Sequence, residues 1–464
     1  MQANMNAASH KSIQLFRVPF ALTALFITVY TAITLLLLSR LSLWLDEIID
    51  LLGTQKQSLV EVTKYAASNR GGTPIWYLTQ ALATRALGFS AFSARLPSCI
   101  ASIAACWGFA LLAKRIGARW PTLYVAAFAL LPLQLRYALE GRPYAEALCL
   151  SVWATVVFLR LLERTTVLNG LLYALLIALG LYTQPYLIFV AAAHVLWALA
   201  NPRVSAKARL FAVGALSVAS VSFVPWLVYA RQIWPDYPAP KIHTAIQIRD
   251  LFLLLRECLG GGYLLTLPVV AAILASVRAG VVRSSTKLLL VLMILLPIGC
   301  AVLVDQLFGY FVASRQVIFV LPSMVLLAGD GIEYIAFKMG GLVATGLTLL
   351  ILTTSVVYDV GWFTRPREDW KAATTVLRQS VDSGACALLS PDLNAQIFLF
   401  FDPALFHRFS DASNISGCSQ IAVADMPNSG EYSATIARQL TDAGFRQRRV
   451  IFAGEPTVTL VSRQ

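Results

Sequence analysis

Residues 18–47 read VPFALTALFITVYTAITLLLLSRLSLWLDE, and residues 18–39 of this stretch carry no charged side chain. An α-helix needs about 20 apolar residues to cross the hydrocarbon core of a bilayer. Residues 18–39 are too long for the apolar core of a signal peptide, and no small-residue cleavage site follows them. We therefore expect an uncleaved membrane-spanning helix, followed at once by Trp44, Asp46 and Glu47.

The composition of the whole chain agrees with a membrane protein. The 464 residues are 58% hydrophobic and only 13% charged, whereas soluble domains are about 45–50% apolar and roughly 25% charged. The net charge of +13 is compatible in principle with nucleic-acid binding. However, the basic residues fall mostly in short connections between apolar runs, and no basic run is interleaved with aromatic residues. We therefore expect no nucleic-acid partner.

Apolar runs of spanning length recur along most of the chain. They predict an α-helical polytopic membrane domain over residues 1–358, with about 11 transmembrane helices. The predicted spans are residues 18–39, 96–113, 120–137, 144–160, 167–183, 185–200, 210–230, 263–279, 287–304, 316–329 and 340–358.

The distribution of basic residues predicts the orientation of these spans. Lys11 and Arg17 precede the first span, and the connections on the same side are rich in lysine and arginine. The short connections on the opposite side carry few basic residues, namely Arg136, Arg142 and Arg315. Positive charge is retained on the cytoplasmic side. We therefore expect a bacterial inner-membrane protein with a cytoplasmic N-terminus and, after an odd number of spans, an extracytoplasmic C-terminus.

The chain changes character after residue 358. We predict a small soluble α/β domain over residues 359–464 on the periplasmic side, since helical and strand patterns alternate there. Cys386 and Cys418 lie in this domain and could form a disulfide if it is exported. Predicted helices are 369–381, 393–401 and 432–443, and predicted strands are 385–389, 419–423, 450–453 and 457–461.

Ionisable residues of the outer connections are the candidates for a functional site. Asp46 and Glu47 follow the first span, where an acidic side chain near the bilayer is a functional candidate. Alternatively, the pair caps a helix that lies along the membrane surface. Glu140 and Arg142 lie in a turn too short to reach far into water, where Arg142 could bind a phosphate or merely pair with Glu140. Arg315 could be a second phosphate contact or reach towards the lipid headgroups.

Other polar residues of the chain give weaker indications of a functional site. Gly71-Gly72-Thr73-Pro74 should end one helix and begin another, and Thr183-Gln184-Pro185 makes a similar turn. His243 is expected to be a solvated loop residue, and His194 a hydrogen-bonded residue within the helix bundle. Seven scattered cysteines without a CxxC pair argue against structural zinc.

An ordered set of motifs resembles the GT-C class of membrane glycosyltransferases, in particular the bacterial branch similar to protein O-mannosyltransferases and the lipid A aminoarabinose transferase. The resemblance implies a GT-C fold, with Asp46 acting as, or assisting, the general base, and with Arg142 and Arg315 holding a carrier phosphate. Glu47, next to Asp46, is a second candidate catalytic residue. The matching stretches are 43–47 (LWLDE), 73–77 (TPIWY), 88–90 (GFS), 94–98 (ARLPS), 140–144 (EGRPY), 181–186 (LYTQPY), 314–316 (SRQ), 321–322 (LP) and 367–371 (REDWK).

The same motifs supply four more candidate substrate-binding residues: Thr73, Glu140, Tyr144 and Gln184. Relatives often have histidine at the position of Gln184 and an aromatic residue at that of Gln316. These departures leave open whether a divalent metal ion takes part, so we treat the cofactor as unknown.

An outward-facing site without a nucleotide motif needs a sugar donor delivered within the bilayer, because nucleotide sugars are cytoplasmic. We therefore expect a polyprenyl-phosphate-linked sugar as donor and a hydroxyl of a lipid, glycan or protein as acceptor. The alternative is a transporter or flippase of a lipid-linked or anionic substrate. Transporters usually place charges and broken helices at the bilayer midplane, often in repeated halves, and neither feature is evident in this sequence.

Overall fold

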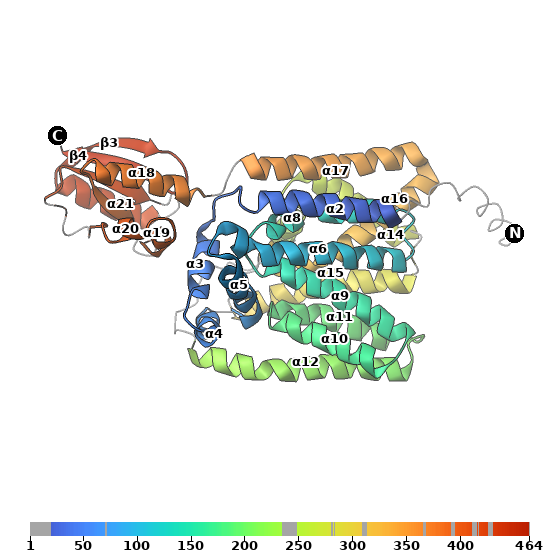
Figure 1. Cartoon of the computed structure of the whole chain (residues 1–464). Helices are drawn as coiled ribbons and strands as arrows, with labels where there is room; N and C mark the ends of the chain where they lie inside the picture. Colours follow the sequence, from blue (N-terminus) through green and yellow to red (C-terminus); the bar gives the residue numbers. More distant parts are fainter. Residues whose placement is uncertain are drawn as a thin grey trace.

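The computed structural model describes most of the chain, including the predicted spans apart from residues 18 and 19. The described residues are 20–69, 72–233, 248–279, 282, 284–308, 313–364, 368–390, 395–410, 415, 417–425 and 430–463. Long helices form a bundle, and a small mixed domain follows at one end of it (Figure 1).

Each of the eleven predicted spans coincides with helical structure. Long helices account for eight of them: α2 (Phe20–Leu37), α6 (Ala91–Arg115), α9 (Tyr144–Glu163), α12 (Ala206–Ile233), α14 (Tyr263–Ala279), α15 (Ser284–Phe308), α16 (Leu321–Met339) and α17 (Gly341–Thr364). Short apolar helices account for two more: α10 (Val167–Leu181) and α11 (Ile188–Ala200), the latter preceded by η2 (Pro185–Leu187).

The predicted spans differ in how completely a single helix forms each of them. Within the described residues, seven helices alone are long and apolar enough to cross a membrane. An eighth arises if α13 (Ile248–Cys258) and α14, bent by 95°, are counted together. The predicted span 120–137 is not one helix but two, α7 (Pro121–Ala129) and α8 (Pro132–Ala138). Pro132 explains the break, since a proline inside a helix removes a hydrogen bond and clashes with the preceding turn.

Three short helices cross one end of the bundle, between the first and second spans. They are α3 (Leu45–Thr54), α4 (Leu59–Ser68) and α5 (Pro74–Leu87), and they lie at the end nearest the C-terminal domain (Figure 1). Ser58 caps α4 by accepting a hydrogen bond from the N–H of Glu61, and Pro74 occupies the first position of α5. This arrangement agrees with the helix break predicted at residues 71–74, of which residue 71 is outside the described residues.

The C-terminal domain confirms the predicted α/β pattern. Its four strands form one sheet in the order β1-β2-β4-β3, in which β1 and β2 are parallel and the other pairs antiparallel. The elements are α18 (Trp370–Asp382), β1 (Cys386–Ser390), α19 (Ala395–Phe401), α20 (Pro403–Phe406), β2 (Gln420–Asp425), α21 (Gly430–Asp442), β3 (Phe445–Phe452) and β4 (Thr457–Arg463).

Cys386 and Cys418 are joined by a disulfide, with their Cα atoms 6.0 Å apart. The bridge links the start of β1 to the segment before β2, so it closes a loop across the sheet. The predicted pairing is therefore confirmed.

The predicted domain boundary at residue 359 needs correction. Helix α17 continues to Thr364, and Asp359 is a buried residue of this helix. A lone polar residue at the end of an apolar run does not end a helix when neighbouring helices cover it. Of the long loop predicted over residues 231–262, residues 234–247, including His243, are outside the described residues, and α13 follows them.

Candidate active site

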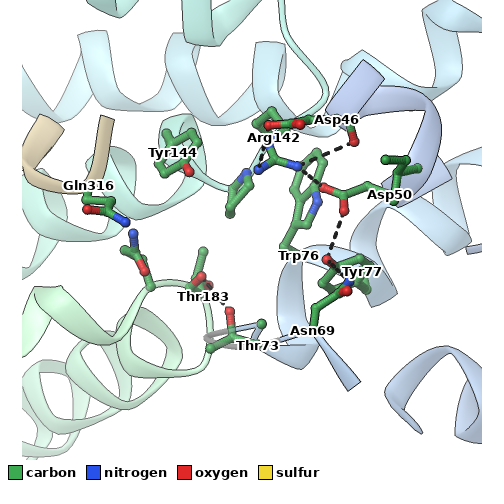
Figure 2. Close-up of a pocket in the computed structure, with 14 residues that line it drawn as sticks. Asp46, Asp50, Asn69, Thr73, Trp76, Tyr77, Arg142, Tyr144, Thr183 and Gln316 are labelled. Atoms are coloured by element: carbon green, nitrogen blue, oxygen red, sulfur yellow. Dashed lines mark hydrogen bonds and ion pairs between the residues drawn. The ribbon is translucent and has the colours of Figure 1, made fainter. Parts of the chain in front are cut away.

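A polar cavity lies at the end of the bundle where α3, α4 and α5 cross it. Its volume is about 260 Å³, and it is lined by α3, the turns before α5, α9 and η2, and the start of η3 (Ser314–Val320). Figure 2 shows side chains from these distant segments pointing into one space. Five of the predicted site residues line it: Asp46, Thr73, Arg142, Tyr144 and Gln184.

Two carboxylates of α3 contact the guanidinium of Arg142. Asp46 Oδ2 lies 3.5 Å from Nη2, and Asp50 Oδ2 accepts a hydrogen bond from Nη1. Asp46 and Asp50 are four residues apart, so a helix places both on one face. Asp50 was not among the candidate residues predicted from the sequence, although it follows Asp46 by four residues. Arg142 is thus held between two carboxylates at the wall of the cavity (Figure 2).

A hydrogen-bond chain supports Asp50 from the other side. Tyr77 Oη donates to Asp50 Oδ1 at 2.9 Å, and Asn69 Nδ2 donates to Tyr77 Oη at 2.8 Å. Burial raises the pKa of the Asp50 carboxyl above its usual value, while Arg142 and Tyr77 oppose this shift. Asp50 therefore fixes Arg142 in place, and Asp46 is the more exposed of the two carboxylates.

Arg142 also contacts aromatic rings. Its guanidinium carbon lies 5.9 Å from the ring centres of both Trp44 and Tyr144, within the range of a cation–π interaction. The turn that carries it is held at its backbone, since Ser98 Oγ donates to the carbonyl of Arg142 at 3.0 Å. A fixed guanidinium at a cavity wall is suited to bidentate binding of a phosphate.

The opposite wall joins two outer turns of the bundle. Thr73 Oγ1 donates to the carbonyl of Thr183 at 2.7 Å, and the N–H of Ile75 donates to the carbonyl of Tyr182 at 3.2 Å. Gln184 follows in the second turn and lines the cavity together with Gln316. This wall presents hydroxyl and amide groups, which can hydrogen-bond to hydroxyls of a sugar or an acceptor.

Glu47 points away from the cavity, contrary to the expectation that it acts beside Asp46. Its side chain is fully buried, and Arg95 binds it through Nε to Oε1 at 2.8 Å and Nη2 to Oε2 at 2.6 Å. The N–H of Gly141 also donates to Oε1 at 2.6 Å. Adjacent residues of a helix point about 100° apart, and here Asp46 faces the cavity whereas Glu47 faces Arg95. Glu47 instead connects α3 to α6 and to the turn that carries Arg142.

Glu140 and Arg315 do not line the cavity either. Glu140 is buried on the other side of the turn from Arg142 and lines a separate small cavity with Glu47, Arg95 and Glu368. Arg315 is half-buried beside Gln316, and its charge interacts with those of Asp46 and Arg142. The local Glu140–Arg142 pair considered from the sequence is therefore replaced by pairs between Arg142 and α3.

His194 is a packed residue of the bundle, as predicted. Its two ring nitrogens form hydrogen bonds with Tyr173 Oη at 3.0 Å and Thr155 Oγ1 at 3.2 Å. Phe158 stacks on the imidazole with 4.5 Å between the ring centres. The ring therefore has hydrogen-bond partners on both nitrogens, and His194 does not line the polar cavity.

Comparisons with known proteins agree with this architecture. Residues 72–229 match the sequence model of a family described as dolichyl-phosphate-mannose-protein mannosyltransferase. The fold is similar to that of ArnT from Cupriavidus metallidurans bound to undecaprenyl phosphate, with a TM-score of 0.59 and 13% sequence identity, covering 94% of this chain and 97% of that one. The chain has the GT-C glycosyltransferase fold.

Two further structures with this GT-C fold are similar. Arabinofuranosyltransferase AftD from Mycobacteria gives a TM-score of 0.54 at 15% identity, covering 94% of this chain and 40% of that one. Oligosaccharyltransferase AglB from Archaeoglobus fulgidus, in complex with an inhibitory peptide and a dolichol-phosphate, gives 0.50 at 10% identity, covering 95% and 74%. A search of curated proteins finds no significant match.

The family match covers only part of the site of this GT-C chain. Residues 72–229 include Thr73, Arg142, Tyr144 and Gln184, but they begin after Asp46. The structure joins the two parts, because Arg142 of the matched region contacts Asp46 and Asp50 directly.

The described residues of the cavity do not form a cluster typical of a metal site. Within the described residues, no group of three or more His, Cys, Asp or Glu side chains is placed to hold one. The two carboxylates that line the cavity both lie against the guanidinium of Arg142, so each already has a cationic partner. We therefore derive no step through a metal.

Proposed function

We propose that the chain is a glycosyltransferase that moves a sugar from a polyprenyl-phosphate carrier to an acceptor hydroxyl at the outer face of the bacterial inner membrane. The observation that carries the proposal is the pairing of Asp46 and Arg142 at one cavity wall. The undecaprenyl phosphate of the ArnT structure and the dolichol-phosphate of the AglB structure support the donor class.

The two groups suit the two ends of a glycosyl transfer. The acceptor oxygen bonds to the anomeric carbon of the sugar as the bond from that carbon to the phosphate oxygen breaks. Asp46 takes the proton of the acceptor hydroxyl, and this needs only a positioned base because the proton leaves as the new bond forms. Arg142 stabilises the charge of the departing polyprenyl phosphate. Asp50 holds Arg142 in place.

Residues in or beside the cavity complete the proposed site. Arg315 adds a second positive charge beside Arg142, and we propose that it contributes to phosphate binding. Thr73, Gln184 and Tyr144 face the space left for sugar and acceptor. The acceptor can be a hydroxyl of a lipid, a glycan or a protein.

The proposed orientation in the membrane rests on the distribution of basic residues and on the disulfide of the C-terminal domain. Arginine and lysine gather in the connections on the side of the N-terminus, as expected for a cytoplasmic side. A disulfide in the C-terminal domain is typical of an oxidising compartment outside the cytoplasm. An alkaline phosphatase fused to the C-terminus should be active, and one fused near Lys207 inactive. The reverse pattern would place the cavity in the cytoplasm and contradict the proposed donor.

Purified protein tests the activity directly. Incubation with a polyprenyl-phosphate-linked sugar and a crude acceptor fraction of the cell envelope should release polyprenyl phosphate and yield glycosylated acceptor. The Asp46→Asn variant should insert into the membrane and bind the carrier, but it should release almost no polyprenyl phosphate from the donor. Reconstitution in vesicles distinguishes the transporter alternative, for which substrate would cross the bilayer while the bond between sugar and phosphate stays intact.

A further inference from the structure

Two carboxylates from distant parts of the chain hold the start of helix α3. Glu368 Oε2 accepts a hydrogen bond from the N–H of Leu45 at 2.6 Å, and Glu47 Oε2 accepts one from the N–H of Trp44 at 3.3 Å. The first N–H groups of a helix have no partner within it, and negative charge is favourable there. Leu45 directly precedes Asp46, so the Glu368 contact fixes the turn that carries the proposed base.

Glu368 is the residue at which the chain enters the C-terminal domain. It is buried, and the same oxygen accepts a second hydrogen bond from Trp370 Nε1 at 2.6 Å. Trp370 begins α18 and is 1% exposed. One carboxylate oxygen thus joins α3 of the membrane domain to α18 of the C-terminal domain. A buried donor that loses such a partner is left unsatisfied, which is unfavourable.

The apolar side of α3 packs against the same domain. Ile48 and Leu51 belong to one buried cluster with Trp370, Leu377 and Phe398. Asp46 and Asp50 lie on the side of α3 that lines the cavity. Helix α3 therefore contacts the C-terminal domain on one side and the cavity on the other. Figure 1 shows it at the end of the bundle nearest that domain.

We infer that the C-terminal domain positions the catalytic helix and that Glu368 is its positioning residue. The inference rests on the proposed function, in which Asp46 is the base. Glu368 does not line the cavity with Asp46 but lines the smaller cavity behind it, so its effect on the reaction passes through α3. A misplacement of about 1 Å can cost roughly 100-fold in rate.

Removal of the carboxylate should therefore slow the reaction more than it weakens binding. Glu368→Ala lowers single-turnover transfer by roughly 100-fold. The Kd for polyprenyl phosphate changes less than the rate, because the turn that carries Arg142 is also held from α6, where Ser98 Oγ donates to the carbonyl of Arg142. Glu368→Gln keeps an acceptor oxygen for Leu45 and Trp370 and retains most of the rate. Hydrogen exchange in residues 45–48 becomes faster in Glu368→Ala.

Two further variants separate this role from general stability. Asp369→Ala is the matched control, since Asp369 Oδ1 caps α18 by accepting from the N–H of Ala372 at 3.1 Å; it should leave the transfer rate of the folded protein and exchange in α3 unchanged. Leu45→Pro deletes the N–H that Glu368 binds. Proline is tolerated at the first helical position, and Trp44 before it is already extended. Combined with Glu368→Ala it should cause no additional loss.

The inference is overturned if Glu368→Ala leaves both transfer and exchange at wild-type values, or if Asp369→Ala slows transfer equally. If the wild-type protein transfers no sugar, the proposed function fails separately. Exchange in residues 45–48 then decides: faster exchange in Glu368→Ala and in Leu45→Pro supports the positioning contact, and unchanged exchange refutes it.

Discussion

Asp46 Oδ2 lies 3.5 Å from Nη2 of Arg142, although helices α4, α5, α6, α7 and α8 lie between the two residues in the sequence. Asp50 contacts the same guanidinium from the next turn of α3. Arg142 thus connects the helix that carries the proposed base to the turn that is proposed to bind phosphate. The proposed base and the proposed phosphate-binding group are therefore held in position by the same contacts.

Replacement of Arg142 should weaken binding of the carrier phosphate. Arg142→Ala removes the fork of donors and leaves Asp50 buried without its charge partner, so both carrier affinity and turnover should fall. Arg142→Lys should restore only part of the affinity, because an ammonium cannot make a bidentate contact. Binding of polyprenyl phosphate, measured alongside single-turnover transfer, checks this prediction.

Arg136→Lys provides the matched control for Arg142. Arg136 lies in α8 with its guanidinium 5.5 Å from the ring centre of Trp362, and it does not line the cavity. Its replacement should leave carrier binding close to wild type. Unchanged carrier binding in both Arg142 variants would mean that Arg142 only holds its turn against α3.

Asp50→Asn should reduce turnover about tenfold or more, since a hydrogen bond to a charged group contributes about 1.5–3 kcal/mol. Burial raises the pKa of Asp50, so this carboxyl takes up a proton at a higher pH than an ordinary aspartate. As the pH falls through that raised value, Asp50 loses its charge and holds Arg142 less firmly. Wild-type turnover should therefore begin to fall on the acid side at a higher pH than an unshifted aspartate would give.

The pH profile of Asp50→Asn supplies the check on this explanation. The variant has no carboxyl to protonate at position 50, so its turnover should lack that part of the acid-side fall. Tyr77→Phe removes the hydrogen bond to Asp50 Oδ1 and should shift the fall to still higher pH. A profile of Asp50→Asn that matches the wild type at every pH would contradict the role of Asp50.

The positions of the spans were predictable because a bilayer sets their length. The sequence also indicated Asp46 and Arg142 as candidates because they follow apolar runs closely, and the structure brings both to one cavity. The orientation of individual side chains was not predictable. Glu47 was expected at the site, but its partner Arg95 lies in another helix, and this pairing cannot be read from local sequence. Asp50 was missed for the converse reason: its spacing from Asp46 was visible, but nothing in the sequence indicated which face of α3 meets Arg142.

The disulfide between Cys386 and Cys418 should stabilise the C-terminal domain. The two cysteines are 32 residues apart, and closing a loop of this size contributes about 3–4 kcal/mol in the chain-entropy model. In the double variant Cys386→Ser, Cys418→Ser the free energy of unfolding of the domain should fall by about that amount, and unfolding should begin at a lower denaturant concentration. The free cysteines Cys99 and Cys106 are buried in the bundle. Mass spectrometry of unreduced peptides should find the 386–418 link, and two free thiols there would refute it.

Glu47→Gln should act on folding and not specifically on the chemical step. Glu47 and Arg95 form a buried pair at 0% and 2% exposure, and removing one partner of such a pair costs about 3–5 kcal/mol. We expect poor accumulation in the membrane and a lower unfolding temperature. Full stability combined with a large loss of turnover would return Glu47 to the list of direct catalytic candidates.

Asp46→Asn should have the opposite signature. The amide keeps the shape of the side chain but cannot accept the proton of the acceptor hydroxyl, so single-turnover transfer should fall by roughly 10²–10⁴-fold. The side chain of Asp46 is 32% exposed and lies at 3.5 Å from Arg142, and exposed ion pairs contribute only about 0–1 kcal/mol. Stability and membrane insertion should therefore remain close to wild type, and carrier binding should persist. Asp46→Glu moves the carboxylate by one methylene and should recover part of the rate. The comparison of Asp46→Asn with Glu47→Gln is decisive, because the two residues are adjacent in sequence and the structure assigns them different surroundings. Normal transfer by Asp46→Asn would exclude Asp46 as the base and leave Asp50 as the carboxylate at the cavity.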